Sequence, residues 1–388
     1  DEAGTAITTG DKNTALGTYS LQSTTTGSDN TALGYIALGE NTTGADNVAL
    51  GRSALQLNTT GSSNTAVGRA ALLLNTTGAN NVAVGKSALA ATTTAQDVTA
   101  VGHESFLANT TGTGTAIGEA SLRSNTTGTD NTALGRQALY SNTTAANNTA
   151  VGRSALFANT TGTQNVAVGS NALYSNQTGN GITAVGGSTL YYNTASNNTA
   201  VGSGSLYANT TGTFNLAVGA GLYGGAAGTL GANSTGSYNT GLGVRALQAN
   251  TTASNNTAIG YAAMYNNTTG ANNTALGYNV LNSNTTGQYN IGIGGNDATN
   301  LTTLSNNTTG SSNVAVGMAA LLNNSTASNN TAVGYQSLRA NTTGAGNTAI
   351  GFSSMSASTT GGNNTAVGQY SLTANTTGYQ TVSIGDES

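Results

Sequence analysis

Short hydrophobic and polar segments alternate along this chain with a period of seventeen residues. Each copy has the form N-T-A-[VLI]-G-x-x-A-L-x-x-N-T-T-G-x-x, and we number its positions 1 to 17, so that Asn64 is position 1 and Asn80 is position 17. A repeat this short and regular predicts coils stacked in one dimension, in which each coil contacts only its neighbours. The glycine of position 5 marks 22 copies, at residues 17, 34, 51, 68, 85, 102, 118, 135, 152, 169, 186, 202, 219, 243, 260, 277, 294, 317, 334, 351, 368 and 385.

The pattern within one copy predicts strands and turns, because seventeen residues are too few for a helical repeat. Thr65 and Val67 alternate with Ala66 and Gly68, as on the two faces of a strand. A second short strand is expected around Leu72, and the Asn-Thr-Thr-Gly segment has the residues of a turn. The fold class is therefore all-β, a parallel β-solenoid of about 22 coils. Identical residues would lie above one another, so Asn and Thr ladders should run from coil to coil.

Departures from the repeat suggest the domain organisation. Residues 1–12 hold only a degenerate copy, and residues 13–388 form a single solenoid domain. The repeats spanning 219–243 and 294–317 contain seven and six extra residues at the same phase, either as tolerated surface loops or as a recognition side. The repeats ending at Gly118 and Gly202 are one residue short, and the missing residue should lie in a turn, since a slip in a strand would exchange its faces.

Few large apolar side chains are available to each coil. Two buried aliphatic side chains contribute on the order of 3–6 kcal/mol, whereas ordering each residue costs roughly 1–2 kcal/mol. We therefore expect either the small-residue face, with Ala66 and Gly68, or the aliphatic face to pack against other chains, in a homotrimer. Solenoid ends without caps would also allow stacking end to end into filaments.

Charge and composition exclude several functions. Charged residues make up 6% of the chain, with 9 basic and 13 acidic side chains. A basic stripe for phosphates is not evident, so nucleic acid is not an expected partner. Cysteine is absent, which excludes disulfides and thiolate metal sites, and no apolar run is long enough to span a membrane.

Catalytic chemistry is not indicated. His103 is the only histidine, at a variable repeat position, where a solvated side chain is the alternative to a catalytic base. Asp29, Asp46 and Asp130 each precede the first Asn of a repeat and suggest a solvated rim. The recurring Asp of calcium-binding solenoids is missing, so neither a metal, a cofactor nor an enzymatic activity is expected.

Two residue types suggest possible surface sites. The repeat generates Asn-x-Thr sequons, which are either glycan attachment sites or simply turn and ladder residues. Tyrosines recur in rows that either pack between protomers or offer platforms for sugars and surfaces. The candidate glycan sites are Asn58, Asn75, Asn109, Asn125, Asn159 and Asn209, and the candidate surface-binding aromatics are Tyr140, Tyr174 and Tyr207.

The unit N-T-A-V-G-x-x-A-L resembles the head repeats of trimeric autotransporter adhesins of the YadA type. That resemblance implies a left-handed β-roll, a trimer and extracellular adhesion. The longer unit also resembles repeats of phage-type tail-fibre proteins, which implies a virion fibre.

Three functions follow from these observations as hypotheses. The first is an adhesive or surface-coating extracellular fibre, located at the cell surface, whose partners are its own copies and cell-surface or matrix glycans. The second is a tail-fibre shaft that presents a receptor-binding tip. The third is an ice-binding solenoid, which would require a flat Thr-x-Thr face.

Overall fold

A computed structural model describes residues 2–221, 228–295 and 301–388. It confirms an all-β parallel β-solenoid with a seventeen-residue spacing, and the described residues form no helix. The chain divides into two compact units, unit 1 (Asp1–Ala184) and unit 2 (Val185–Ser388). Both contain the same kind of coil, and the single-domain organisation stays a prediction.

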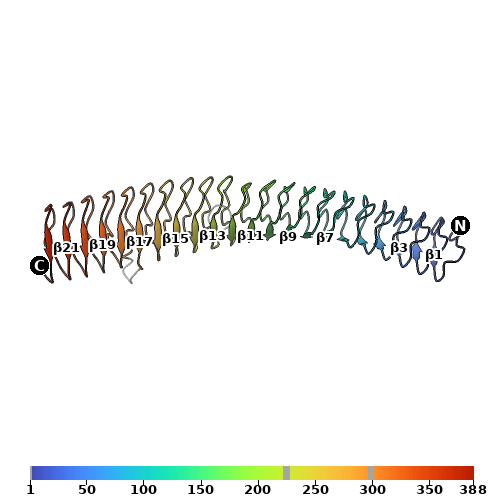
Figure 1. Cartoon of the computed structure of the whole chain (residues 1–388), viewed down its shortest axis with the longest axis horizontal. Helices are drawn as coiled ribbons and strands as arrows, with labels where there is room; N and C mark the ends of the chain where they lie inside the picture. The colour runs from blue at the N-terminus through green and yellow to red at the C-terminus, as the bar shows by residue number, and fades with distance from the viewer. Residues whose placement is uncertain (1, 222–227, 296–300) are drawn as a thin grey trace. The chain divides into compact units, whose positions relative to one another are not determined.

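Each coil contributes one short strand, and neighbouring strands within a unit pair in parallel (Figure 1). The strand β11 (Thr183–Val185) lies where the two units meet in the sequence. Unit 1 contains β1 (Thr14–Leu16), β2 (Thr31–Leu33), β3 (Val48–Leu50), β4 (Thr65–Val67), β5 (Val82–Val84), β6 (Thr99–Val101), β7 (Gly114–Ile117), β8 (Asn131–Leu134), β9 (Thr149–Val151) and β10 (Val166–Val168). Unit 2 contains β12 (Thr199–Val201), β13 (Leu216–Val218), β14 (Thr240–Leu242), β15 (Thr257–Ile259), β16 (Thr274–Leu276), β17 (Ile291–Ile293), β18 (Val314–Val316), β19 (Thr331–Val333), β20 (Thr348–Ile350), β21 (Thr365–Val367) and β22 (Val382–Ile384).

The strand register is constant even where the repeat length changes. Thr99 pairs with Thr115 across the short repeat, and Leu216 pairs with Thr240 across the first long one. Ala100 still pairs with Ala116, so both strands keep the same face inward. In these repeats the change in length falls outside the strands, as the face argument predicts. Of the two insertions, residues 222–227 and 296–300 lie outside the described residues.

The second strand predicted near Leu72 is wrong, because that segment is a pair of tight turns. Ala70 and Leu72 have φ of 58° and 49°, in the left-handed region. The Ala71 amide donates back to Gly68 O (3.3 Å), and the Leu72 amide donates to Ala88 O of the next coil (3.0 Å). A left-handed conformation costs an L-residue about 1–2 kcal/mol. Full burial of a leucine offsets that cost.

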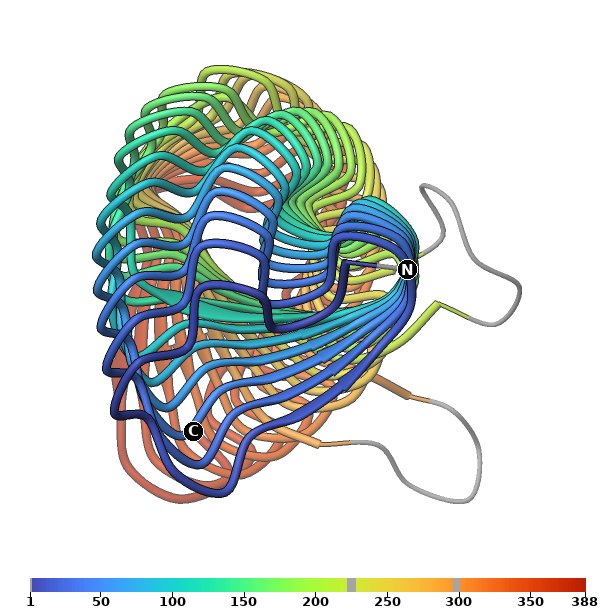
Figure 2. The ribbon, with the colours of Figure 1, turned by 90° about the vertical axis from the view of Figure 1, so that its right-hand side faces the viewer.

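The interior of each coil combines small, aliphatic and carboxamide side chains. Successive coils follow the same path within each unit, so equivalent residues stack (Figure 2). In the coil of β4, Ala66, Ala71, Leu72 and both asparagines are fully buried. The small-residue face thus lies inside the chain's own core, and the prediction that it packs against other chains is wrong. Gly68 is required for close approach, because its φ is 131° and a Cβ would lie 2.7 Å from Gly85 O.

Two buried asparagine ladders confirm the asparagine part of the predicted side-chain ladders, whereas the turn threonines donate to backbone carbonyls of the next coil, as Thr59 Oγ1 does to Thr76 O (3.0 Å). At position 12, Asn75 Nδ2 donates to Asn58 Oδ1 of the preceding coil (2.8 Å). At position 1, the Asn64 backbone N–H and Nδ2 both donate to Asn47 Oδ1 (3.0 and 3.2 Å). Both asparagines of one repeat also donate to the same carbonyl, as Asn64 and Asn75 do to Gly78 O (2.8 and 3.0 Å). Most buried carboxamides are therefore paired within the chain, as a stable interior requires. Among the described residues the exceptions are Asn75 Oδ1, Gln248 Oε1, Asn341 Oδ1, Ser358 Oγ and Asn375 Nδ2, which are buried without a hydrogen-bond partner.

Candidate interaction surfaces

The outer side of the sheet carries the side chains of positions 2 and 4, and we call it the strand face. In β4, Thr65 and Val67 are half-buried while Ala66 between them is buried. The aliphatic row at position 4 is the more exposed part, with Leu33 at 46% and Leu276 at 44%. Parallel register places one such side chain on every coil, so each unit exposes a continuous aliphatic row beside a row occupied mainly by threonine. The strand face of the described strands is therefore mixed threonine and aliphatic.

The residues after the position-5 glycines form a row that sequence reasoning missed. We call position 6 of unit 1 from residue 52 to residue 153 the cationic row. Its side chains are exposed, and the backbone fixes their order, since the position-7 amide donates to the position-6 carbonyl of the preceding coil (Ala70 N to Arg52 O, 3.0 Å). The chain thus has a basic stripe after all, although its residues lie sixteen or seventeen positions apart in the sequence. The row consists of Arg52, Arg69, Lys86, His103, Glu119, Arg136 and Arg153.

Among the arginine and lysine side chains of this row, only Arg136 forms an ion pair with a described carboxylate. Glu119 accepts from Arg136 Nε (3.1 Å). None of Arg52, Arg69, Lys86 and Arg153 lies within 4.0 Å of a carboxylate of the described residues. The Arg52 guanidinium lies 5.7 Å from the Tyr35 ring centroid, a weak cation–π contact at an exposed site. Neighbouring cations at one coil spacing repel each other, which makes the row attractive to anions.

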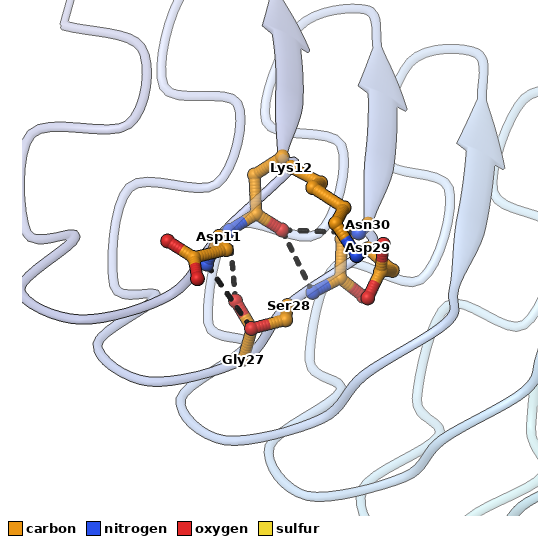
Figure 3. A network of polar contacts seen from close by, with 7 residues as sticks. Asp11, Lys12, Gly27, Ser28, Asp29 and Asn30 are labelled. Carbon is orange, nitrogen blue, oxygen red and sulfur yellow. Dashed lines mark hydrogen bonds and ion pairs between the residues drawn. The ribbon is translucent and has the colours of Figure 1, made fainter.

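An acidic row precedes the strands at position 17. It contains Asp29, Asp46, Asp97 and Asp130, all exposed, which agrees with the predicted solvated rim. Figure 3 shows how adjacent coils connect there: the Asp29 amide donates to Asp11 O (3.0 Å), and Lys12 Nζ lies 3.7 Å from Asp29 Oδ1. Because position 17 precedes the strand and position 6 follows it, the strand face of unit 1 has acidic and basic residues along opposite edges.

His103 lies in the cationic row beside a small charged network. Its Nε2 is 3.7 Å from Glu104 Oε1, and its side chain is 46% exposed. Arg123 Nε donates to Glu104 Oε2 (2.9 Å), and this hydrogen bond lowers the pKa of the Glu104 carboxyl and raises the pKa of Arg123. Arg123 also lies over the Tyr140 ring, 5.7 Å from its centroid. This network holds charged side chains at the surface and leaves His103 open to solvent.

The predicted tyrosine rows are stacks within one chain. Tyr140 and Tyr174 stack on the two sides of Phe157, with centroids 5.1 and 5.0 Å from it. In unit 2, Tyr207 stacks on Tyr191 at 5.4 Å. Burial is the largest of the effects that raise the pKa of Tyr207. Stacked rings present mainly their edges, so sugar stacking on open ring faces is disfavoured at Tyr140, Tyr174 and Tyr207.

All six predicted glycan sites are fully buried members of the position-12 ladder. Each Nδ2 donates inside the chain, for example from Asn58 to Asn41 Oδ1 and to Gly61 O (both 2.8 Å). Because a glycan is attached to this nitrogen, a sugar would break the ladder, and the folded chain offers no access. The ladder alternative therefore accounts for Asn58, Asn75, Asn109, Asn125, Asn159 and Asn209.

The described residues contain neither a metal-ligand cluster nor a membrane-spanning helix. Across residues 2–221, 228–295 and 301–388, no three His, Asp or Glu side chains gather as metal ligands. The same residues contain no helix with the length and hydrophobicity needed to cross a bilayer.

Comparison with known proteins identifies no family. No protein-family model matches the chain, and no curated protein matches it either. The resemblances to adhesin heads and tail fibres therefore stay hypotheses that rest on the repeat unit alone.

Proposed function

We propose that this chain is a non-catalytic structural protein of an extracellular fibre, in which copies associate side by side through the strand face. One observation carries this proposal: the coil pairs most of its own buried polar groups but leaves a continuous aliphatic row partly exposed. Contiguous exposed apolar surface of this kind usually marks an interface. The surface-coating or adhesive role and the left-handed trimer belong to the same hypothesis, and the tail-fibre shaft is its alternative.

The size of the aliphatic row supports association. Covering an aliphatic side chain that is about 40% exposed contributes roughly 1 kcal/mol. In unit 1 this exposure is reached by Leu16, Leu33, Ile117 and Leu134, and the other position-4 side chains are less exposed. The row of one unit therefore supplies several kcal/mol, at most about 10 kcal/mol, which lies within the cost of association, estimated at about 4–15 kcal/mol. Contacts repeated along a unit would make association stronger with each added coil.

Charge favours copies that run in the same direction. Rotation about an axis parallel to the stack places the acidic row of one copy beside the cationic row of the next. An antiparallel pair would place like charges together, which costs free energy. Parallel association accommodates three copies around one axis, and we therefore propose the trimer.

Mass photometry and sedimentation velocity of the full chain test the assembly. A trimer has three times the chain mass of 38.0 kDa. Replacing Leu33, Val67 and Leu134 on the strand face by lysine should release monomers. The matched control replaces Thr60, Thr77 and Thr127, exposed threonines of the Asn-Thr-Thr-Gly turns, by lysine and should leave the mass unchanged. A wild-type chain that stays monomeric at micromolar concentration, or variants that behave alike while circular dichroism shows folded coils, would refute the proposal.

A further inference from the structure

The cationic row of unit 1 lies along one edge of the strand face, and among its arginine and lysine side chains only Arg136 forms an ion pair with a described carboxylate. Arg52, Arg69 and Lys86 occupy position 6 of three consecutive coils, and Arg136 and Arg153 occupy it two and three coils after His103. Five of the nine basic residues of an acidic protein thus lie on one line. Their exposed side chains and missing carboxylate partners mean that intramolecular ion pairing does not account for Arg52, Arg69 and Lys86.

Spacing defines the ligand that fits this line. Adjacent coils are one strand spacing apart, about 4.8 Å, and the backbone bonds from Ala70 N to Arg52 O (3.0 Å) and from Ser87 N to Arg69 O (2.9 Å) hold that interval. Charges this close lie within one Debye length, about 8 Å at physiological salt, and act together. A linear polymer with one negative charge per unit of similar length can therefore place an anion at each coil.

We propose that the cationic row binds an extended acidic polysaccharide that carries one carboxylate or sulfate per sugar ring. The length of a sugar ring in an extended chain is close to one coil spacing. A nucleic-acid duplex fits less well, because the charges of each strand lie about 3.4 Å apart along its axis, and single-strand binding sites add aromatic side chains that stack on bases. The row from residue 52 to residue 153 contains no Phe, Tyr or Trp.

Glu119 interrupts the row and provides an internal test. Its Oε2 forms an ion pair with Arg136 Nε at 3.1 Å, and its negative charge would repel a polyanion at this coil. Glu119→Gln removes this charge and frees Arg136, so it should tighten binding. Glu40→Gln changes the net charge by the same amount at an exposed position outside the row, and it should have no comparable effect.

The experiment measures binding of oligogalacturonate to the full chain by isothermal titration calorimetry at several salt concentrations. Arg52→Gln/Arg69→Gln/Lys86→Gln should raise the Kd roughly tenfold or more and lower its salt dependence. Arg245→Gln/Arg339→Gln, which removes cations of unit 2, should leave the Kd unchanged, and fully methyl-esterified oligogalacturonate should not bind. Circular dichroism of each variant verifies the fold.

Three outcomes would overturn the proposal. The first is that oligogalacturonate does not bind. The second is that Glu119→Gln and Glu40→Gln change the Kd equally, which would mean that net charge alone determines binding. The third is that single-stranded DNA of equal charge binds more tightly at the same salt concentration. Oligomeric mass is measured in parallel. If Arg52→Gln/Arg69→Gln/Lys86→Gln loses polysaccharide binding but keeps its oligomeric mass, the polysaccharide site is separate from the strand face. If this variant changes its mass and the wild type binds no polysaccharide, the row serves self-association instead.

Discussion

A break in the position-12 ladder of unit 2 yields a sharp stability prediction. Asn341 Oδ1, Ser358 Oγ and Asn375 Nδ2 are buried without a hydrogen-bond partner, and these residues occupy three consecutive coils. In an intact stretch of the ladder, Asn58 donates to Asn41 of the coil before it and accepts from Asn75 of the coil after it. Serine at position 358 is too short to do either. Ser358→Asn should therefore supply both missing partners.

The expected gain follows from the cost of unpaired groups. An unpaired buried polar atom costs about 1–3 kcal/mol, and the replacement satisfies one acceptor and one donor while removing the unpaired hydroxyl. Ordering the longer side chain offsets part of this gain. We expect a net stabilisation of about 2 kcal/mol. The interior around position 12 accommodates asparagine, because the neighbouring coil has Asn341 at this position, fully buried.

Hydrogen exchange measured by mass spectrometry is the suitable assay, because stability in a repeat protein is local rather than global. Peptides covering residues 341–375 should exchange about 30-fold more slowly in Ser358→Asn, whereas peptides of unit 1 should not change. Asn58→Ser, the reverse replacement in an intact stretch, should speed exchange around residues 41–75. Unchanged protection in Ser358→Asn would show that water or a local rearrangement already satisfies these atoms.

Three further predictions concern the coil and its surface. Ala70→Gly should leave the free energy of unfolding unchanged or raise it by up to about 1 kcal/mol, since φ at Ala70 is 58° and glycine avoids the left-handed penalty. Ala66→Gly, in the buried strand, should lower the stability measured in the same thermal melts. Equal effects of the two replacements would contradict a left-handed turn at Ala70. Because the pKa of Glu104 is lowered in the folded state, its ion pair with Arg123 stabilises the fold above pH 4.5, and this contribution, at most about 1 kcal/mol, is lost as the pH falls through the folded pKa. In thermal melts between pH 7 and pH 3, Glu104→Gln should therefore lose less stability on acidification than the wild type. Equal losses in both proteins would refute a stabilising role for this ion pair. Because the strand face combines threonine with aliphatic side chains, freezing-point measurements should show no thermal hysteresis, and a clear hysteresis gap would favour the ice-binding hypothesis.

Much of the fold could be predicted from the period alone. A strict seventeen-residue repeat with Thr-Ala-Val alternation implies stacked strands, and stacking implies ladders of identical side chains. The Asn-Thr-Thr-Gly turn could be predicted, but the turns around Ala70 and Leu72 could not be, because Ala and Leu avoid left-handed angles in isolation. At Leu72 burial and the amide bond to Ala88 O outweigh that preference. Which face points inward was also open, since alternation alone does not distinguish Ala66 inside from Ala66 outside.

The cationic row shows why surface chemistry is harder to see in a repeat sequence. Its members are isolated in sequence, and a search for charged clusters along the chain finds none. Because the coils stack in parallel register, residues one repeat apart in the sequence lie one coil apart in space. The residue types at a single repeat position therefore determine the charge along one edge of the strand face. Position 6 holds Arg69 and Lys86 in unit 1 but Tyr261 and Tyr278 in unit 2, where the two rings stack at 5.3 Å. The same backbone thus presents a basic edge in one unit and an aromatic edge in the other, and reading the sequence by repeat position, rather than along the chain, reveals both.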